Sequence, residues 1–245
     1  MSAIVSNIQQ VRARIATACG LAQRPVQSVT LLAVSKTVPA EVVRSAFEAG
    51  ERRFGENYVG EGVAKIAALS DLRERIEWHL IGPLQSNKTR EAAEHFDWVQ
   101  SVDRLKIAQR LSAQRPVHLP PLNVCLQVNV SGEASKSGVA PGEVAALAHE
   151  VAALPRLVLR GLMAIPEPTT DVAEQRRSHA VLRELFTELR GEGLALDTLS
   201  MGMTADLEAA VLEGATMVRV GTAIFGARAL PAVEASPCKW GGGAR

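Results

Sequence analysis

Lys36 is the residue whose position in this sequence points most directly to chemistry. It closely follows a strongly apolar run, VTLLAV at 29–34. A lysine at the end of a buried strand is partly shielded from water, and desolvation lowers the pKa of a lysine below its usual value of about 10.4. The neutral amine is a nucleophile that condenses with aldehydes. Lys36 is therefore a candidate for covalent attachment of an aldehyde, although a strand-end lysine that reaches solvent is the plainer interpretation of this position taken alone.

A candidate phosphate site is found much later in the sequence, in two short motifs that contain Ser200, Gly202, Gly221 and Thr222. Glycines let the backbone approach an anion closely, and hydroxyl groups donate hydrogen bonds to it. We also expect Thr204 to cap the following helix, whose first N–H groups would then face the anion. Together these residues predict a cradle for a phosphate group.

Two further polar residues interrupt apolar surroundings. Arg219 lies in the run MVRV at 217–220, and a buried guanidinium needs a partner. An ion pair with a carboxylate such as Glu56 and a contact with a ligand are both open at this point. His79 is expected to be a core histidine with satisfied hydrogen bonds rather than a general base.

Short apolar runs alternate with amphipathic helical stretches eight times along the 245 residues. The runs cover 29–36, 53–58, 77–84, 98–103, 122–130, 157–166, 198–203 and 217–226. Several are almost continuously apolar, which is typical of parallel strands covered on both faces. Eight such units in about 250 residues predict a single α/β domain, a (β/α)8 TIM barrel.

We expect an extra helix at 2–20 before the first strand, a barrel domain over 1–230 and a flexible tail over 231–245. The tail contains a Ser-Pro pair and three consecutive glycines. A doubly wound open sheet is the main alternative fold. That fold commonly carries a glycine-rich turn after its first strand, and no such turn follows the first run here.

Composition excludes several classes of protein. There are 27 Lys and Arg against 26 Asp and Glu, giving a net charge of +1, which argues against the broad basic field of a nucleic-acid binder. The three cysteines are far apart in the sequence and show no metal-ligand spacing, so we expect no metal site. No apolar run approaches the roughly 20 residues that span a bilayer, and the first residues do not resemble a signal peptide. These features favour a cytoplasmic protein that does not bind membranes.

The predicted barrel brings the candidate residues together, because the active sites of such barrels lie at the C-terminal ends of the strands. Lys36 follows the first strand, and the phosphate cradle follows the seventh and eighth strands. An aldehyde-reactive lysine that faces a phosphate cradle describes a site for pyridoxal 5′-phosphate (PLP), since this cofactor carries both groups.

Five motifs resemble those of the pyridoxal phosphate homeostasis proteins, a family whose barrel is similar to the N-terminal domain of alanine racemase. The motifs are AVSKT at 33–37, FGENY at 54–58, HLIGPLQSNK at 79–88, LSMGM at 199–203 and VRVGTAIFG at 218–226. The resemblance implies a site in which Lys36 forms a Schiff base with PLP and Arg219 faces the pyridine nitrogen. It also implies that Asn57 lies near the ring and that the phosphate is bound by Ser200, Gly221 and Thr222.

The function implied by this resemblance is to hold PLP and hand it over, in vitamin B6 homeostasis, without robust catalysis. Apo forms of PLP-dependent enzymes are candidate recipients, and Lys88 and Lys136 are candidates for a secondary or transfer site. We expect a monomer, since no exposed apolar stripe is evident in the pattern.

Two alternatives remain open. An amino-acid racemase needs a second acid–base group opposite the lysine, typically a tyrosine from a further domain. The single tyrosine, Tyr58, lies in the second motif, and eight strands use the chain up to residue 226, which disfavours this alternative. A cofactor-free Schiff-base aldolase that acts on a phosphorylated sugar would share the lysine and the phosphate cradle.

Overall fold

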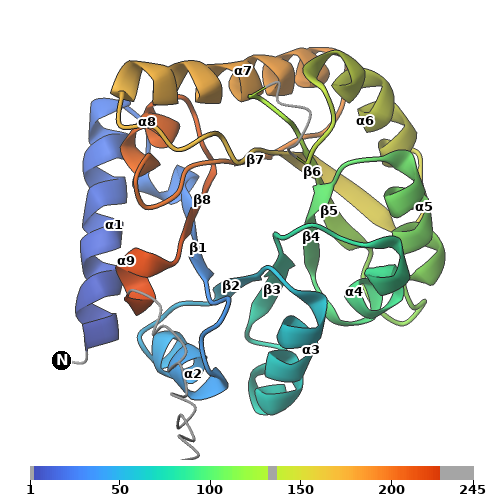
Figure 1. Ribbon diagram of the computed structural model, residues 1–245, viewed down its shortest axis with the longest axis horizontal. Helices are drawn as coiled ribbons and strands as arrows, with labels where there is room; N and C mark the ends of the chain where they lie inside the picture. The colour runs from blue at the N-terminus through green and yellow to red at the C-terminus, as the bar shows by residue number, and fades with distance from the viewer. Residues whose placement is uncertain (1–2, 132–136, 227–245) are drawn as a thin grey trace, which may run out of the picture.

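Eight parallel strands form a closed barrel in the computed structural model, which describes residues 3–131 and 137–226 (Figure 1). Each strand pairs with its neighbours in chain order, and β1 pairs with β8 to close the ring. The strands are β1 (Thr30–Val34), β2 (Arg53–Glu56), β3 (Glu77–Leu80), β4 (Trp98–Val102), β5 (Leu122–Gln127), β6 (Leu157–Met163), β7 (Thr198–Ser200) and β8 (Met217–Val220). The predicted (β/α)8 barrel is confirmed.

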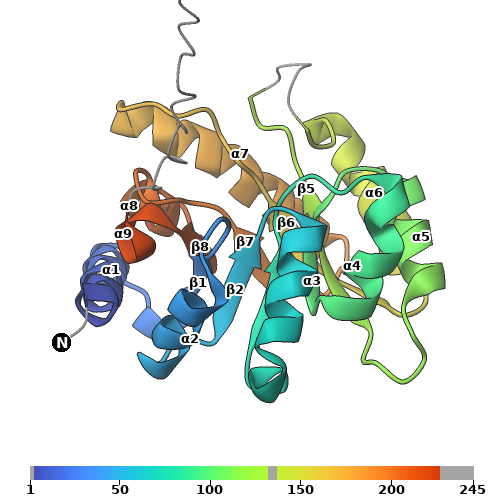
Figure 2. The same cartoon turned by 60° about the horizontal axis from the view of Figure 1, so that its bottom comes forward.

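Helices surround this ring of strands (Figures 1 and 2). They are α1 (Ala3–Leu21), α2 (Ala40–Glu48), α3 (Val59–Ala68), α4 (Thr89–His95), α5 (Leu105–Gln114), α6 (Val144–Ala152), α7 (Val172–Gly191), α8 (Leu207–Leu212) and α9 (Thr222–Phe225). Short 3₁₀ turns complete the connections: η1 (Val26–Ser28), η2 (Ser70–Leu72), η3 (Ser86–Lys88) and η4 (Pro141–Glu143). The expected extra helix is α1, which packs beside α8 and α9.

The apolar core has an outer layer and an inner layer. The outer layer is one large cluster between the strands and the helices, to which α1 contributes Ile8, Val11 and Ile15. Successive residues of β1 divide between the layers, since Leu31 and Ala33 join the outer cluster whereas Leu32 and Val34 belong to a separate one. Because side chains alternate across a strand, the separate clusters fill the barrel interior. These inner clusters are Leu32, Val34, Ile81 and Met217, and Trp98, Cys125 and Met163.

The strands start within one residue of the predicted positions and end earlier than predicted. The largest difference is in the last run, where 222–225 was expected to be strand and forms the helix α9. Residues such as Lys36 and Asn57 therefore lie in loops that follow the strands. The predicted tail at 231–245 lies outside the described residues.

Candidate functional site

Lys36, Asn57 and Gly221 lie in the loops that follow β1, β2 and β8, at the C-terminal end of the barrel, whereas the predicted site residues Ser200 and Arg219 lie within β7 and β8. The register of β1 against β8 pairs Leu32 with Arg219, so the loop that carries Lys36 lies beside Gly221. A Cβ atom at Gly221 would lie 3.1 Å from the carbonyl oxygen of Val34, which explains the small residue there. Lys36 and Gly221 are half-buried.

Asn57 and Thr222 flank these residues in the same set of loops. Asn57 follows β2 and is half-buried, and Thr222 begins α9 and is exposed. Gly82, after β3, packs directly on the Asn57 backbone, because a Cβ atom at Gly82 would come within 2.1 Å of the Asn57 carbonyl oxygen. Closure of the barrel thus places the segments that carry Lys36, Asn57, Gly221 and Thr222 at the same end of the barrel.

A buried ion pair supports the residue that precedes Lys36. The Lys65 ammonium, on α3, donates to both carboxylate oxygens of Glu56 at 3.0 Å and to the Ser35 carbonyl oxygen at 2.5 Å. The Ser35 hydroxyl donates to Glu56 at 2.5 Å. Burial raises the pKa of Glu56, although Lys65 and the Ser35 hydroxyl oppose that rise. The suggested ion pair between Glu56 and Arg219 is wrong, because Lys65 is the partner of this carboxylate.

The residue that follows Lys36 is held by the same group of charges. The backbone N–H of Thr37 donates to Glu61 at 2.5 Å, and Glu61 also accepts from Lys65 at 2.7 Å. Thr37 has a φ of 63°, in the left-handed region that non-glycine residues seldom adopt. The Lys36 backbone is thus fixed on both sides by hydrogen bonds.

Arg219 is the buried cation of the site, only 3% exposed. Its Nη1 donates to the Ser200 hydroxyl at 2.9 Å, and its Nη2 donates to the Ala164 carbonyl oxygen at 2.7 Å. Burial lowers the pKa of Arg219 to about 10, so the guanidinium keeps its charge at neutral pH. These bonds use the two terminal nitrogens and not Nε.

Ser200 lies deeper than the other residues predicted to bind the phosphate. It is fully buried, and its hydroxyl donates to Gln100 at 2.7 Å while accepting from Arg219. The geometry assigns this hydroxyl to the barrel interior rather than to an open anion site.

The loop after β7 is fixed from two helices. Asp206 accepts from the Met203 N–H at 2.7 Å and from His179 on α7 at 3.0 Å, and Arg14 on α1 donates to the Thr204 carbonyl oxygen at 2.8 Å. Burial alone would raise the pKa of Asp206, but the hydrogen bond from His179 helps to lower it. Asp206 precedes α8 as its N-terminal flanking residue, so the expectation that Thr204 caps this helix is wrong.

The remaining predictions concern residues other than those expected to bind the cofactor directly. His79 is fully buried with both ring nitrogens in hydrogen bonds, which confirms it as a satisfied core histidine. Lys88 forms an ion pair with Glu91 at 2.8 Å near the surface. Lys136 lies outside the described residues.

Sequence reasoning missed two supporting residues. Gln100 binds the Ser200 hydroxyl that contacts Arg219, and Lys65 binds the carbonyl oxygen of the residue before Lys36. Gln100 had a visible signal, since it is an amide inside the apolar run WVQSV. Lys65 had none, because a lysine on an amphipathic helix is ordinarily solvated.

The described residues show neither of two other kinds of site. Within 3–131 and 137–226, no group of three or more His, Cys, Asp or Glu side chains is placed to hold a metal ion. None of the helices there has the length and apolar character needed to cross a bilayer.

The fold and the site define a class of protein, the barrels of the alanine racemase type. The family model described as "Alanine racemase, N-terminal domain" matches residues 2–229. Among curated relatives, the pyridoxal phosphate homeostasis protein of Pseudomonas aeruginosa is 64% identical over 93% of this chain and 97% of that protein. The protein of the same name from Escherichia coli K12 is 53% identical over 93% of this chain and 98% of that protein. The chain belongs to the pyridoxal phosphate homeostasis protein family.

Solved structures agree with this assignment. PipY of Synechococcus elongatus PCC7942, solved without PLP, is 41% identical with a TM-score of 0.81, over 91% of this chain and all of PipY (100%). The same protein with PLP bound gives 40% identity and a TM-score of 0.80 at the same coverage. Alanine racemase from Corynebacterium glutamicum is 18% identical with a TM-score of 0.70, over 95% of this chain and 63% of the racemase, which shows a shared fold only.

Proposed function

We propose that this protein binds PLP at the C-terminal mouth of its barrel and acts in intracellular PLP homeostasis, holding the cofactor on Lys36 without robust catalysis. One observation carries the proposal: β1 pairs with β8, so the loop of Lys36 lies beside Gly221 and follows a strand paired with that of the buried Arg219. The names of the relatives at 53% and 64% identity and the PLP-bound PipY structure support it.

The residues present fit this cofactor. PLP supplies an aldehyde that condenses with a lysine amine and a pyridine ring that withdraws electrons. Lys36 is half-buried in a loop whose neighbouring residues are held by hydrogen bonds, and Arg219 is a buried guanidinium whose Nε is not used by its two interior bonds. A permanently charged arginine facing the ring nitrogen keeps that nitrogen unprotonated, which weakens the ring as an electron sink. A ring of this kind stabilises carbanions poorly, which suits a carrier of PLP better than an efficient enzyme.

We assign the phosphate to the start of α9, where Gly221 and Thr222 offer backbone N–H groups and a hydroxyl. Gly202, with a φ of 91°, keeps the adjacent β7 loop close to α8. Asn57 is the neighbour of the ring in this proposal. The contribution of Ser200 is indirect, through Arg219, because its hydroxyl is already bonded on both sides.

The test of this proposal is the visible absorbance of the protein mixed with PLP, followed by borohydride reduction. We expect a yellow protein in which reduction fixes pyridoxal on Lys36, detected by peptide mass spectrometry. Lys36→Ala should be colourless, whereas Lys106→Ala, which removes an exposed lysine of α5, should be as yellow as the parent. An unchanged spectrum in Lys36→Ala would refute the assignment of Lys36. Absence of colour in the parent protein would refute PLP binding. The cofactor-free Schiff-base aldolase would then be the favoured alternative.

The racemase alternative has a separate test. Tyr58 is 62% exposed at the start of α3, and the likeness to alanine racemases is too distant to indicate more than the fold. We expect incubation with L-alanine and other L-amino acids to give little D-isomer by chiral chromatography. Rapid racemisation would contradict the carrier proposal.

The finer parts of the proposal concern location, oligomeric state and partners. We propose a cytoplasmic monomer that binds neither nucleic acid nor membranes and delivers PLP to apo enzymes. Light scattering after size exclusion should give a mass near 26.1 kDa. Lys88 and Lys136 remain the candidates for a transfer site, and their alanine variants should slow transfer of PLP to an apo enzyme without reducing the colour of the loaded carrier.

A further inference from the structure

A continuous chain of four hydrogen bonds crosses the barrel interior and ends on Arg219. Arg219 Nη1 donates to Ser200 Oγ at 2.9 Å, and Ser200 Oγ donates to Gln100 Oε1 at 2.7 Å. Gln100 Nε2 lies 2.8 Å from His79 Nδ1, and His79 Nε2 lies 2.9 Å from Glu77 Oε1. The five residues come from β8, β7, β4 and β3 and link the two ends of the barrel.

The chain runs through apolar surroundings. His79, Gln100 and Ser200 are completely buried in the barrel interior with the inner apolar clusters, and Gln100 Nε2 also lies 3.2 Å from the sulfur of Met217. The Trp98 ring stacks on His79 with 5.0 Å between ring centroids and 14° between planes. Buried polar groups in such surroundings are costly to leave without partners, so each link depends on the next.

While His79 is neutral, only one assignment of donors and acceptors gives all five residues of the chain a hydrogen-bond partner. Gln100 Nε2 donates to His79 Nδ1, so the histidine proton is on Nε2 and faces the Glu77 carboxylate. Burial lowers the pKa of His79, which favours the neutral ring. A neutral ring with its proton on Nδ1 would instead direct a lone pair at the carboxylate.

This direction matters to Arg219. The Gln100 carbonyl oxygen accepts the hydrogen bond from the Ser200 hydroxyl, which leaves a lone pair of Ser200 Oγ to accept from the guanidinium. A Gln100 amide turned by half a rotation would direct an N–H group at the same hydroxyl oxygen. Two donors would then compete for Ser200, and the bond that holds Arg219 would weaken.

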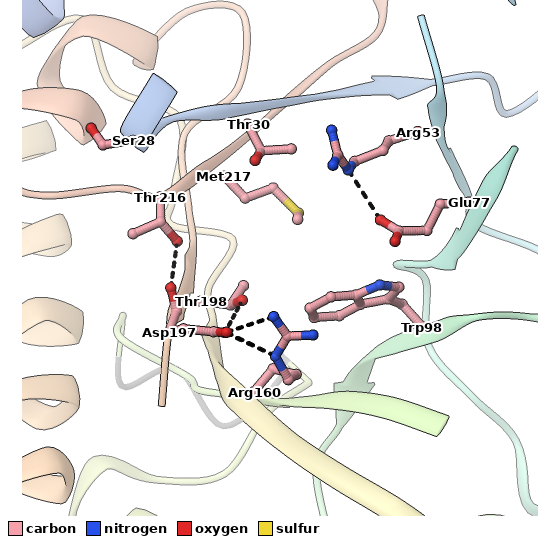
Figure 3. A pocket seen from close by; sticks show the side chains of 10 residues that line it. All are labelled: Ser28, Thr30, Arg53, Glu77, Trp98, Arg160, Asp197, Thr198, Thr216 and Met217. Carbon is pink, nitrogen blue, oxygen red and sulfur yellow. Dashed lines mark hydrogen bonds and ion pairs between the residues drawn. The ribbon is translucent and has the colours of Figure 1, made fainter. Parts of the chain in front are cut away.

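The far end of the chain lies at the N-terminal mouth of the barrel. There the first residues of several strands surround a hollow of about 300 Å³, and Glu77 lies at its wall with Arg53 at 3.1 Å (Figure 3). The Glu77 side chain is 38% exposed, so the chain starts at solvent on the face opposite to Lys36.

We propose that Gln100 is a positioning residue for the cofactor: anchored by neutral His79, its amide orients the Ser200 hydroxyl and thereby fixes the guanidinium of Arg219. This inference rests on the proposed PLP site. It assigns a role in cofactor binding to residues deep in the barrel that never reach the cofactor.

The first test removes the amide. In Gln100→Leu we expect the dissociation constant for PLP, measured by fluorescence titration of the apoprotein, to rise about tenfold or more, with a shifted absorbance maximum. Ser101→Ala is the matched control, since Ser101 is the buried neighbour on the same strand and its hydroxyl has no hydrogen-bond partner among the described residues. Its affinity should stay within about twofold of the parent. Parental affinity and spectrum in a folded Gln100→Leu protein would overturn the proposal.

A second variant separates positioning from packing. Gln100→Glu keeps an oxygen acceptor for Ser200 but has no N–H for His79 Nδ1. We expect its PLP affinity to return most of the way from the Gln100→Leu value, while His79 acquires a proton on Nδ1. An affinity as low as that of Gln100→Leu would show that the acceptor is not what matters. If Gln100→Leu does not fold, Gln100→Met takes its place, because an unbranched side chain adapts to the same space.

The His79 tautomer is read without any cofactor, from the ring ¹⁵N shifts of the apoprotein, with His79→Gln to assign the signals. We expect a neutral ring with its proton on Nε2 in the parent. A proton on Nδ1 in the parent would overturn the direction of the chain. If the tautomer is as expected but the parent binds no PLP, the proposed function is wrong. The direction of the hydrogen-bond chain is then still correct.

Discussion

At the scale of single residues, the backbone on either side of Lys36 is held by the charged side chains of Glu61 and Lys65. Glu56 is completely buried, and Lys65 is nearly so, at 8% exposure of its side chain. Such a pair contributes little net stability when it is intact, but removal of one partner leaves the other charge buried and unpaired. Their arrangement is therefore best understood as a support for the loop that carries Lys36.

Lys65→Met should lower the free energy of unfolding by about 3–5 kcal/mol, because the Glu56 carboxylate loses its cation. The double variant Lys65→Met/Glu56→Gln should recover most of this loss, since no buried charge remains. Urea denaturation followed by circular dichroism measures both. Equal stability of Lys65→Met and the parent would contradict the buried ion pair.

His79 should make stability depend on pH. Its pKa is lowered by burial, so the folded protein keeps the ring neutral where the unfolded chain, with a pKa near about 6.5, takes up a proton. The unfolded state then binds more protons, and stability should fall as the pH falls below about 6.5. His79→Gln should show a shallower dependence on pH between about 6.5 and 5.

Glu77 acts in a lower range of pH. Although burial alone would raise its pKa, hydrogen bonding to His79 contributes to lowering it to about 2. Its contribution to stability should be lost only as the pH falls from about 4.5 towards about 2. Melting temperatures across the two ranges distinguish the groups, and identical pH profiles for His79→Gln and the parent above pH 5 would exclude the role of His79.

At the scale of elements, the positions where the strands start could be predicted from the sequence, and the positions where they end could not. The apolar run at 29–36 starts one residue before β1 and outlasts it by two residues. Ser35 is buried and Lys36 is half-buried, so the loop after the strand is also shielded from water, and pattern alone does not distinguish such a loop from a strand. For the same reason, the sequence pattern did not separate the four-residue helix α9 from strand β8.

The loops also show which parts of the site had a sequence signal. Lys36, Arg219 and Gly221 stand out as polar residues or glycines within apolar runs, and the pairing of β1 with β8 brings their segments together. The partners of Arg219, namely Ser200 and the Ala164 carbonyl oxygen, depend on which strands face each other across the interior. That information is three-dimensional and leaves no trace in spacing along the chain.

Gly82→Ala tests how tightly these loops pack. A Cβ atom there would overlap the Asn57 carbonyl oxygen, so the backbone of one loop must move. We expect a loss of about 1–3 kcal/mol in stability and weaker PLP binding. Gly60→Ala is the matched control, since a Cβ at this position of α3 meets open space and should stabilise the helix by up to about 1 kcal/mol. Equal effects of the two substitutions would contradict the close contact.

At the scale of the whole molecule, the ring is complete only when β8 lies between β7 and β1. Removal of β8 would expose the edges of both neighbours, and open edges pair with other chains. The sequence predicted this closure from eight repeats and the chain length.

A chain that stops at residue 213, before β8, should aggregate and should bind no PLP. The matched control stops at residue 230, the predicted domain boundary, and should remain monomeric with the colour of the full chain. Size exclusion and absorbance measure both. A monomeric 213-residue fragment with native-like circular dichroism would show that closure is dispensable, and loss of folding in the control would move the domain boundary.

Because β1 pairs with β8, the barrel closes only after its last strand has been synthesised. Lys36 emerges from the ribosome early, whereas Arg219 and Gly221 are among the last residues of the barrel to be made. On the proposed assignment of the site, the nascent chain has Lys36 long before it has Arg219 and Gly221. Selective binding of PLP should therefore follow translation of the whole barrel, and an incomplete chain should not hold the cofactor selectively.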